Sequence, residues 1–279
     1  MAVSAEKAKI ARRMVEVLDY FDDQHQELTV MDIVRRYNRP QSSTSELLSS
    51  LVELGILYKN PYSRSYSLTP RAAMLSAVAQ PEMIRNGRLT EIVDRLVAQT
   101  GLSVGVFGMV RLTVQIFHHK AGNWPIGTSN SQKIWRGVQD SLAASAAGHL
   151  LLSTLPQSQR DGIVRRLNAE AAEDSKFSPS EMNQKIAACA QTGSSHGSAG
   201  FGTAAETCCI LLPGQCEKQP LALGFIYEPN AQLEAETLIT CLRETVSRVS
   251  QPAKPETAII HPPKADILPS SSSLLSSVA

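Results

Sequence analysis

Apolar side chains recur at helical spacing near the start of the chain. The stretch 7–23 places its apolar positions on one helical face, at Ile10, Met14, Leu18 and Phe21. A second run follows Thr29, whose hydroxyl can cap a helix, and repeats the spacing at Val30, Ile33, Val34 and Tyr37. Proline disfavours helical angles in the residue before it, so Asn38-Arg39-Pro40 predicts a break.

A third helix and a hairpin are predicted directly after this break. The residues Gln41 to Ser45 form the helix's first turn, and its buried stripe comprises Leu47, Leu48, Leu51 and Leu54. Gly55 can reverse the chain because glycine accepts left-handed angles. The runs 56–58 and 65–68 then alternate like two strands around a turn at 60–64. Residues 1–69 therefore predict a winged helix-turn-helix domain, a shape that inserts its second helix into a major groove.

The remaining chain alternates helical and strand-like runs. We interpret 70–88 as a connector helix and linker, starting at Thr69-Pro70 with a capping hydroxyl and an N1 proline. Helices are predicted at 89–100, 142–155, 157–167, from Ser178 to about 191, and at 231–249. Strands are predicted within 102–119, 208–213 and 220–227, whereas 192–204 is interpreted as a glycine-rich loop.

This order of elements predicts an α+β fold with an antiparallel sheet over 89–250. Residues 251–279 contain five prolines, and the last ten positions contain six serines. Such a segment cannot bury enough apolar surface to offset the entropy of ordering, so a disordered Pro/Ser-rich tail is predicted.

Composition narrows the class of protein. A hydrophobic content of 43% and a charged content of 19% are ordinary for a soluble globular protein. The net charge is only +1, but residues 30–75 contain six Lys/Arg against three Asp/Glu. The five cysteines include no CxxC pair, which argues against a secreted disulfide framework. With neither a signal peptide nor a run long enough to cross a membrane, we expect a cytoplasmic protein without membrane attachment.

Several segments resemble the IclR family of bacterial transcription regulators. The line SSTSELLSSLVELGIL (42–57) is similar to the family's recognition helix, with Glu46 where an arginine is usual. The lines LTEIVDRLVAQTG (89–101) and AASAAGHLLLSTLP (143–156) resemble its entry helix and its small-residue helix. The strand at 209–213 resembles Cys-Ile-Ala-x-Pro, and the run from Ala222 resembles the final strand, with Gly224 and Ile226 in place of ligand-contacting serines.

The resemblance implies a GAF-like second domain that binds a small organic effector, such as an organic acid, and shifts affinity for double-stranded DNA. It implies four effector-binding residues: Ser145, Gly148, Cys209 and Gly224. Two-fold protein symmetry must be mirrored in an operator, so we expect a homodimer or a homotetramer.

DNA contact needs cations or N–H groups for phosphates, and side chains that pair with base edges. Groups of this kind predict seven DNA-binding residues: Arg39, Gln41, Ser42, Ser43, Thr44, Ser45 and Arg64. The alternative is a winged helix used for protein–protein assembly, which near-neutral charge and Glu46 would suit.

Enzymatic and metal-dependent functions are less well supported. Cys208 and Cys209 could form a thiol sensor, but an apolar strand favours buried, inert thiols. His118 and His119 lack a spaced set of further ligands, so neither a metal nor a cofactor is expected. The motif around Ser195 matches G-x-S-x-G, which is a nucleophile only on a strained strand-to-helix turn, and no third triad member is apparent.

Overall fold

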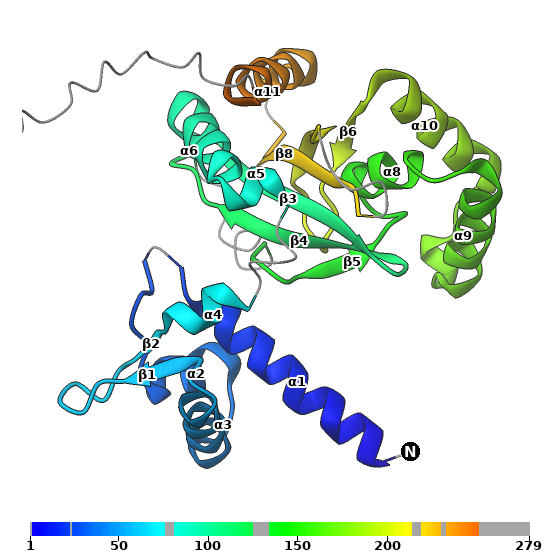
Figure 1. Cartoon of the computed structure of the whole chain (residues 1–279). Coiled ribbons are helices and arrows are strands. Elements are labelled where there is room, and N and C mark those ends of the chain that lie inside the picture. The colour runs from blue at the N-terminus through cyan, green and yellow to red at the C-terminus, as the bar shows by residue number, and fades with distance from the viewer. Residues whose placement is uncertain are drawn as a thin grey trace, which may run out of the picture.

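The computed structural model describes residues 2–22, 24–75, 81–124, 134–213, 219–229 and 233–250, with side chains from residue 9 onward. It has a small N-terminal unit of helices and a hairpin, which we call the head, and a larger sheet-based unit, which we call the sensor half (Figure 1). The predicted tail at 251–279 and most of the 214–219 connection lie outside the described residues.

The head contains the three predicted helices and the predicted hairpin. In order they are α1 (Ala2–Tyr20), α2 (Val30–Tyr37), α3 (Gln41–Glu53), β1 (Leu57–Lys59) and β2 (Tyr66–Leu68). The two strands pair antiparallel, with Leu57 opposite Leu68. This arrangement confirms a winged helix-turn-helix.

Local sequence explains the boundaries of α2. Thr29 accepts a hydrogen bond from the Asp32 N–H, and the Asp32 carboxylate accepts one from the Thr29 N–H, which forms a reciprocal cap. Asn38 ends the helix in the left-handed conformation, at φ 48°. Most members of the predicted stripes then meet in one core, whose fully buried members include Val17, Ile33, Leu48 and Leu51. The prediction was wrong for Ile10 and Leu54, which are 55% and 57% exposed. Ile10 lies in the part of α1 that extends beyond the other head helices, and Leu54 follows the last residue of α3 (Figure 1).

The connector begins with α4 (Pro70–Met74) and continues, beyond residues 76–80, with α5 (Glu82–Arg85). The prediction that Thr69 caps α4 through its hydroxyl is wrong. That hydroxyl donates instead to the Gly55 carbonyl at 2.6 Å, because the chain turns back across the end of α3 here.

The sensor half is built on a six-stranded antiparallel sheet, which confirms the α+β prediction. Its strands are β3 (Ser103–Val110), β4 (Thr113–Lys120), β5 (Gln139–Ser141), β6 (Ser194–Ser198), β7 (Glu206–Leu211) and β8 (Leu221–Tyr227). Their spatial order is β5-β4-β3-β8-β7-β6, so β5 and β6 form the two edges.

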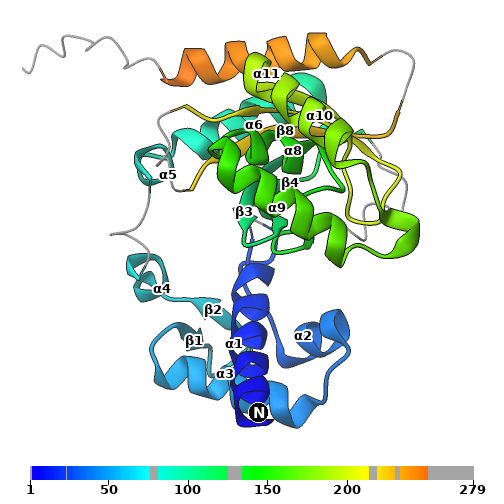
Figure 2. The same cartoon turned by 90° about the vertical axis from the view of Figure 1, so that its right-hand side faces the viewer.

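Helices cover both faces of this sheet (Figures 1 and 2). One face carries α6 (Arg88–Thr100) and α11 (Ala235–Ser250). The other carries α8 (Ala146–Ser153), α9 (Gln157–Glu170) and α10 (Pro179–Thr192), with a short 3-10 turn at Glu173–Ser175. Two apolar cores result, one on each side of the sheet.

Strand β6 corrects the sequence interpretation of 192–204 as loop. Gly193, at φ +66°, ends α10, and the next five residues pair with β7 from Ser194 opposite Ile210 to Ser198 opposite Glu206. Glycine suits position 197 because its φ of +140° is one that side chains rarely adopt; a β-carbon there would make only an ordinary contact with that of Ala146, at 3.9 Å. Among the described helices, none is long and apolar enough to cross a membrane.

Candidate functional sites: the head surface and a cavity in the sensor half

The amino-terminal turn of α3 lies on the surface of the head. Gln41 and Ser42 are exposed, and Ser43 and Ser45 are partly exposed. Pro40 occupies the N-cap position and makes no side-chain cap, so the first N–H groups of the helix are not taken up by a capping side chain. These groups can bind an anion and read base edges together.

Thr44 lies apart from this surface. Its side chain is buried in the head, and its hydroxyl donates to the Pro40 carbonyl at 2.9 Å. The residue therefore holds the turn between α2 and α3. Glu46, two residues further along α3, is exposed.

Arg39 is engaged within the head. Its guanidinium forms an ion pair with the Glu16 carboxylate of α1 and lies 5.2 Å from the centroid of the Tyr37 ring. The Tyr37 hydroxyl donates to the Glu16 carbonyl at 2.7 Å, and burial raises the pKa of this tyrosine to about 12. The ion pair joins α1 to the turn that positions α3.

Arg64 lies at the tip of the wing, where it is exposed and has a positive φ of 57°. The Asn60 side-chain oxygen accepts hydrogen bonds from the N–H groups of Tyr62 and Ser63, which shapes the tip. Tyr62 is 95% exposed beside it. The tip thus presents a cation and an aromatic ring to solvent.

The head and the sensor half contact each other where α1 ends beside the sheet (Figure 2). Arg136 donates to the Phe21 carbonyl at 3.5 Å and approaches the His118 Nδ1 at 3.4 Å. Asp19 lies close to Gly137, because a β-carbon there would lie 2.9 Å from the Asp19 Oδ2. Burial raises the pKa of the Asp19 carboxyl, and the Arg136 charge opposes the shift. We call these residues the joint.

The four residues that the resemblance implies for effector binding lie around the start of α8 and the middle of the sheet. Ser145 is buried and caps α8 by accepting the Gly148 N–H at 3.0 Å. Gly148 lies against the Leu142 backbone, since a β-carbon would lie 2.1 Å from that carbonyl oxygen. All four are closely packed.

Cys209 and Gly224 belong to one cross-strand row. Gly224 pairs with Cys209, and Cys209 pairs with Ser195 on β6. A side chain at Gly224 would start 2.6 Å from the Cys209 β-carbon, which explains why glycine occupies the position. Paired residues of an antiparallel sheet project to the same face, so the row leads from the core to Ser195.

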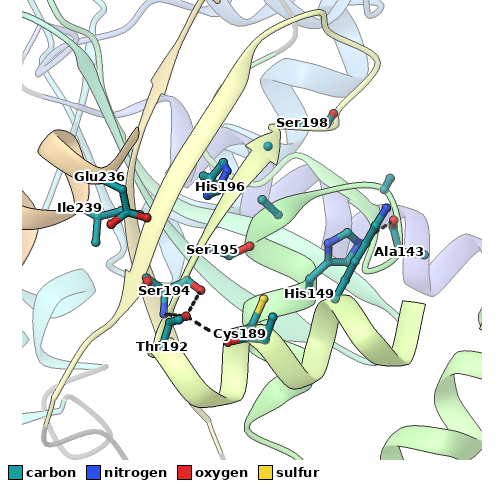
Figure 3. Close-up of a pocket in the computed structure, with 15 residues that line it drawn as sticks. Ala143, His149, Cys189, Thr192, Ser194, Ser195, His196, Ser198, Glu236 and Ile239 are labelled. Atoms are coloured by element: carbon teal, nitrogen blue, oxygen red, sulfur yellow. Dashed lines mark hydrogen bonds between the residues drawn. The ribbon is translucent and has the colours of Figure 1, made fainter. Parts of the chain in front are cut away.

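Ser195 opens onto a cavity of about 520 Å³ between α8, α10, β6 and the start of α11 (Figure 3). Sequence reasoning identified none of the polar residues of its wall as effector ligands: His149, Lys185, Thr192, Ser194, Ser195, His196, Ser198 and Glu236. The apolar part of the wall is formed mainly by alanines and Ile239. These residues were missed because 192–204 was interpreted as a loop. Only the strand β6, which that segment contains, brings these side chains to one wall.

The cavity contains charges of both signs. Lys185 is exposed on one wall, and Glu236 contributes a carboxylate on another. Burial lowers the pKa of His149, whose ring nitrogen lies 3.0 Å from the Ala143 carbonyl, and the nearby Lys185 charge lowers it further. Burial raises the pKa of the Cys189 thiol, which is hydrogen-bonded to the Ser195 hydroxyl. The cavity suits a small polar ligand with an apolar part.

The described structure does not favour a thiol sensor at the cysteines or a metal site at the histidines. Cys208 and Cys209 project to opposite faces of the sheet, and burial raises the pKa of Cys208 to about 12. Within the described residues, no group of three or more His, Cys, Asp or Glu side chains could hold a metal ion. Ser195 lies within a strand and not on a strand-to-helix turn, so the nucleophile geometry is not formed.

Comparison with known proteins agrees with this architecture. Residues 11–61 match the family model described as the IclR helix-turn-helix domain. No curated protein matches the chain. An IclR transcriptional regulator from Alicyclobacillus acidocaldarius is similar in structure, with a TM-score of 0.56 at 18% identity, over 87% of this chain and 96% of that one.

Two further solved structures share the fold. An IclR homolog from Microbacterium hydrocarbonoxydans, complexed with 4-hydroxybenzoate, has a TM-score of 0.55 at 17% identity, over 86% of this chain and 97% of that one. The effector domain of an IclR regulator from Acinetobacter sp. ADP1 has a TM-score of 0.51 at 18% identity, over 62% of this chain and 99% of that one. The resemblance to IclR-type regulators is thus confirmed, by sequence in the head and by fold over most of the chain.

Proposed function

We propose that this protein is a cytoplasmic DNA-binding transcription regulator whose operator affinity is modulated by a small molecule. The observation that carries the proposal is the exposed first turn of α3 beside the wing, within the segment that matches the IclR helix-turn-helix model. In this arrangement Gln41, Ser42, Ser43 and Ser45 face base edges and phosphates, and Arg64 contacts the backbone. Arg39 and Thr44 hold α3 in place through contacts within the head.

The test is binding of genomic fragments at increasing salt concentration. Phosphate contacts release counterions, so the logarithm of the affinity should fall linearly with the logarithm of the salt concentration. The rival function, a winged helix that assembles with another protein, is favoured by exposed Glu46 and by the pairing of Arg39 with Glu16. Affinity that is independent of salt would support that rival and refute DNA binding.

We propose further that the effector occupies the cavity at β6, with Cys209 and Gly224 behind its wall. The solved relative with 4-hydroxybenzoate supports a ligand of the aromatic or organic acid type. In this chain, Lys185 would pair with the carboxylate, and the alanine wall would pack against the apolar part. Lys185→Ala should therefore weaken binding of 4-hydroxybenzoate as a probe, whereas Lys176→Ala, which breaks only an exposed ion pair with Glu173, should not.

The joint gives a route from this half to the head. A ligand changes DNA affinity only if it binds the competent and incompetent arrangements unequally. Phe21 of the head contacts Arg136 of the sensor half, and Asp19 contacts Gly137. A displacement of the sensor half at these contacts would therefore reorient α1, in addition to any change transmitted by the connector at 70–88.

Arg136→Ala should change fragment affinity without changing the salt slope, because Arg136 itself touches no phosphate. The matched control is Arg166→Ala, which breaks an exposed ion pair with Glu170 on α9 and should leave affinity unchanged. Equal affinities of wild type and Arg136→Ala would remove the joint from the mechanism.

Exposed apolar residues on the head support a homodimer or a homotetramer. They lie on α1, at the end of α3, on the hairpin and on α4, as Ile10, Val15, Leu54, Tyr58, Leu68, Met74 and Leu75. Exposed apolar surface often marks a protein–protein contact, so we take these side chains as candidates for the contact between copies. Sedimentation of the wild type and of Met74→Glu should give a smaller species for the variant. No enzymatic step is proposed, because the Ser195 region lacks a nucleophile turn.

A further inference from the structure

The outer edge of β6 carries unpaired backbone groups. Gly193 accepts from the Leu211 N–H, and Ala199 donates to the Ala205 carbonyl, so the odd-numbered residues of the strand face β7. The N–H and C=O groups of Ser194, His196 and Ser198 therefore point away from the sheet. Thr192 satisfies both groups of Ser194 through its hydroxyl, at 3.3 and 3.0 Å. Within the described part of the chain, His196 and Ser198 have no such partner on that side.

This edge opens directly onto the cavity. The cavity is lined by the whole of β6, by α8 and α10 on one side of the sheet, and by Glu236 and Ile239 of α11 on the other (Figure 3). A strand added here would alternate its side chains between the alanine wall and Ile239. Exposed edges are usually protected in native proteins, and an extended segment that adds to the sheet is one way to do so.

We propose that this edge binds residues 257–261 of the same chain, Thr-Ala-Ile-Ile-His, as a seventh strand. The segment has the five-residue length of β6 and three β-branched side chains, which favour strands. Pro262-Pro263 follows it, and one of two adjacent prolines must turn a nitrogen without a hydrogen toward β6, so pairing ends there. Its two adjacent isoleucines project to opposite faces, one toward the alanine wall and the other toward Ile239, so the segment and the effector would exclude each other from the cavity.

The length of the intervening chain fits this placement. The segment follows α11, whose last residue, Ser250, is eleven residues beyond Ile239 at the cavity. Eleven residues of helix span about 17 Å. The six residues 251–256, fully extended, reach about 20 Å, which is enough to return along α11 to the cavity. The occupant is therefore tethered at an effective concentration of the order of millimolar.

Hydrogen exchange at single backbone amides tests this proposal. In the full chain, the His196 and Ser198 amides should exchange about tenfold more slowly than in a chain ending at Ser250, if the tethered segment is about 90% bound. The Ser195 and Gly197 amides face β7, so they serve as internal controls and should be unchanged. Equal exchange of His196 and Ser198 in both chains would overturn the proposal.

Point variants locate the segment. Adjacent residues of a strand alternate, so one of Ile259→Pro and Ile260→Pro must remove an N–H that faces β6 and should abolish the extra protection. Ile267→Pro, outside the segment, should preserve it. Full protection in both segment variants, or its loss in Ile267→Pro, would refute the assignment to 257–261. A synthetic peptide covering 254–264 should restore protection to the chain ending at Ser250. Protection of the full chain that declines on dilution would assign the segment to a second copy and would overturn the intrachain contact.

Discussion

The substitution Arg64→Ala at the tip of the wing tests whether the head contacts DNA phosphates, because it removes one exposed positive charge and leaves the fold of the head intact. Arg64 is exposed at the tip of the β1–β2 hairpin and has no ion-pair partner among the described residues, so Arg64→Ala removes a charge without breaking an internal contact. Alanine is a better test substitution than glycine. Arginine and alanine both have a β-carbon, so both are strained at the φ of 57°, whereas glycine would relieve that strain and change the turn.

The expected magnitude follows from counterion release. Each phosphate contact contributes about 0.9 to the slope of log affinity against log salt. One lost arginine should therefore flatten the slope by about 0.9 for a bound head, and by about 1.8 if both heads of a dimer bind. Between 50 and 200 mM salt, that difference corresponds to about 3.5-fold in affinity per arginine. Fluorescence anisotropy of a labelled duplex pool measures both quantities.

Arg111 provides a matched control. It is also exposed, at the tip of the β3–β4 hairpin, and has a similar φ of 59°, but it lies in the sensor half. Arg111→Ala should leave the salt slope unchanged. The reasoning is refuted if Arg64→Ala keeps the wild-type slope, or if Arg111→Ala flattens it equally.

Three further predictions concern stability. Thr29→Ala should lower the free energy of unfolding of the head by about 1 kcal/mol, read from a denaturant melt; an unchanged midpoint would contradict the capping role. Gly148→Ala should destabilise the sensor half by roughly 3 kcal/mol or more, because its β-carbon would meet the Leu142 carbonyl, whereas Gly162→Ala, in open space on α9, should stabilise by about 0.5–1 kcal/mol. Burial lowers the pKa of His119 from 6.5 to about 4, so the contribution of this histidine to the free energy of unfolding should be constant above about pH 6.5 and fall toward pH 4, by no more than about 3 kcal/mol. A His119→Gln variant with the same pH dependence would show that other groups cause the fall.

Periodicity predicted the elements that bury a continuous apolar stripe. The spacing of Ile33, Leu48 and Leu51 reproduces the three-helix core of the head, and the apolar runs at 208–213 and 220–227 reproduce two inner strands of the sheet, β7 and β8. Each of these elements gains stability from its own apolar side chains, so the signal lies within its own sequence.

The edge strands were missed for the opposite reason. The residues of β6, Ser-Ser-His-Gly-Ser, contain no large apolar side chain, and β5 is only three residues long. Both strands form because β7 and β4 offer backbone partners, a condition that becomes visible only when the sheet is assembled. The polar residues lining the cavity could not be predicted, since the cavity depends on β6.

Close packing around Gly224 and Cys209, two of the residues that the resemblance implies for effector binding, leaves no room for a ligand directly on them. We therefore expect an effector to bind beside them. A ligand atom contacting Gly224 would need the space above it, but even a β-carbon there meets the Cys208 carbonyl oxygen at 2.5 Å. Gly105, the next residue in the same row, is covered by the Phe107 ring, since a β-carbon would lie 2.8 Å from it. The row therefore becomes accessible toward its other end, at Ser195, where β6 borders the cavity. We therefore expect ligand specificity in this chain to depend on β6 and α10, at Ser195 and Lys185, more than on Gly224 and Ile226 of β8.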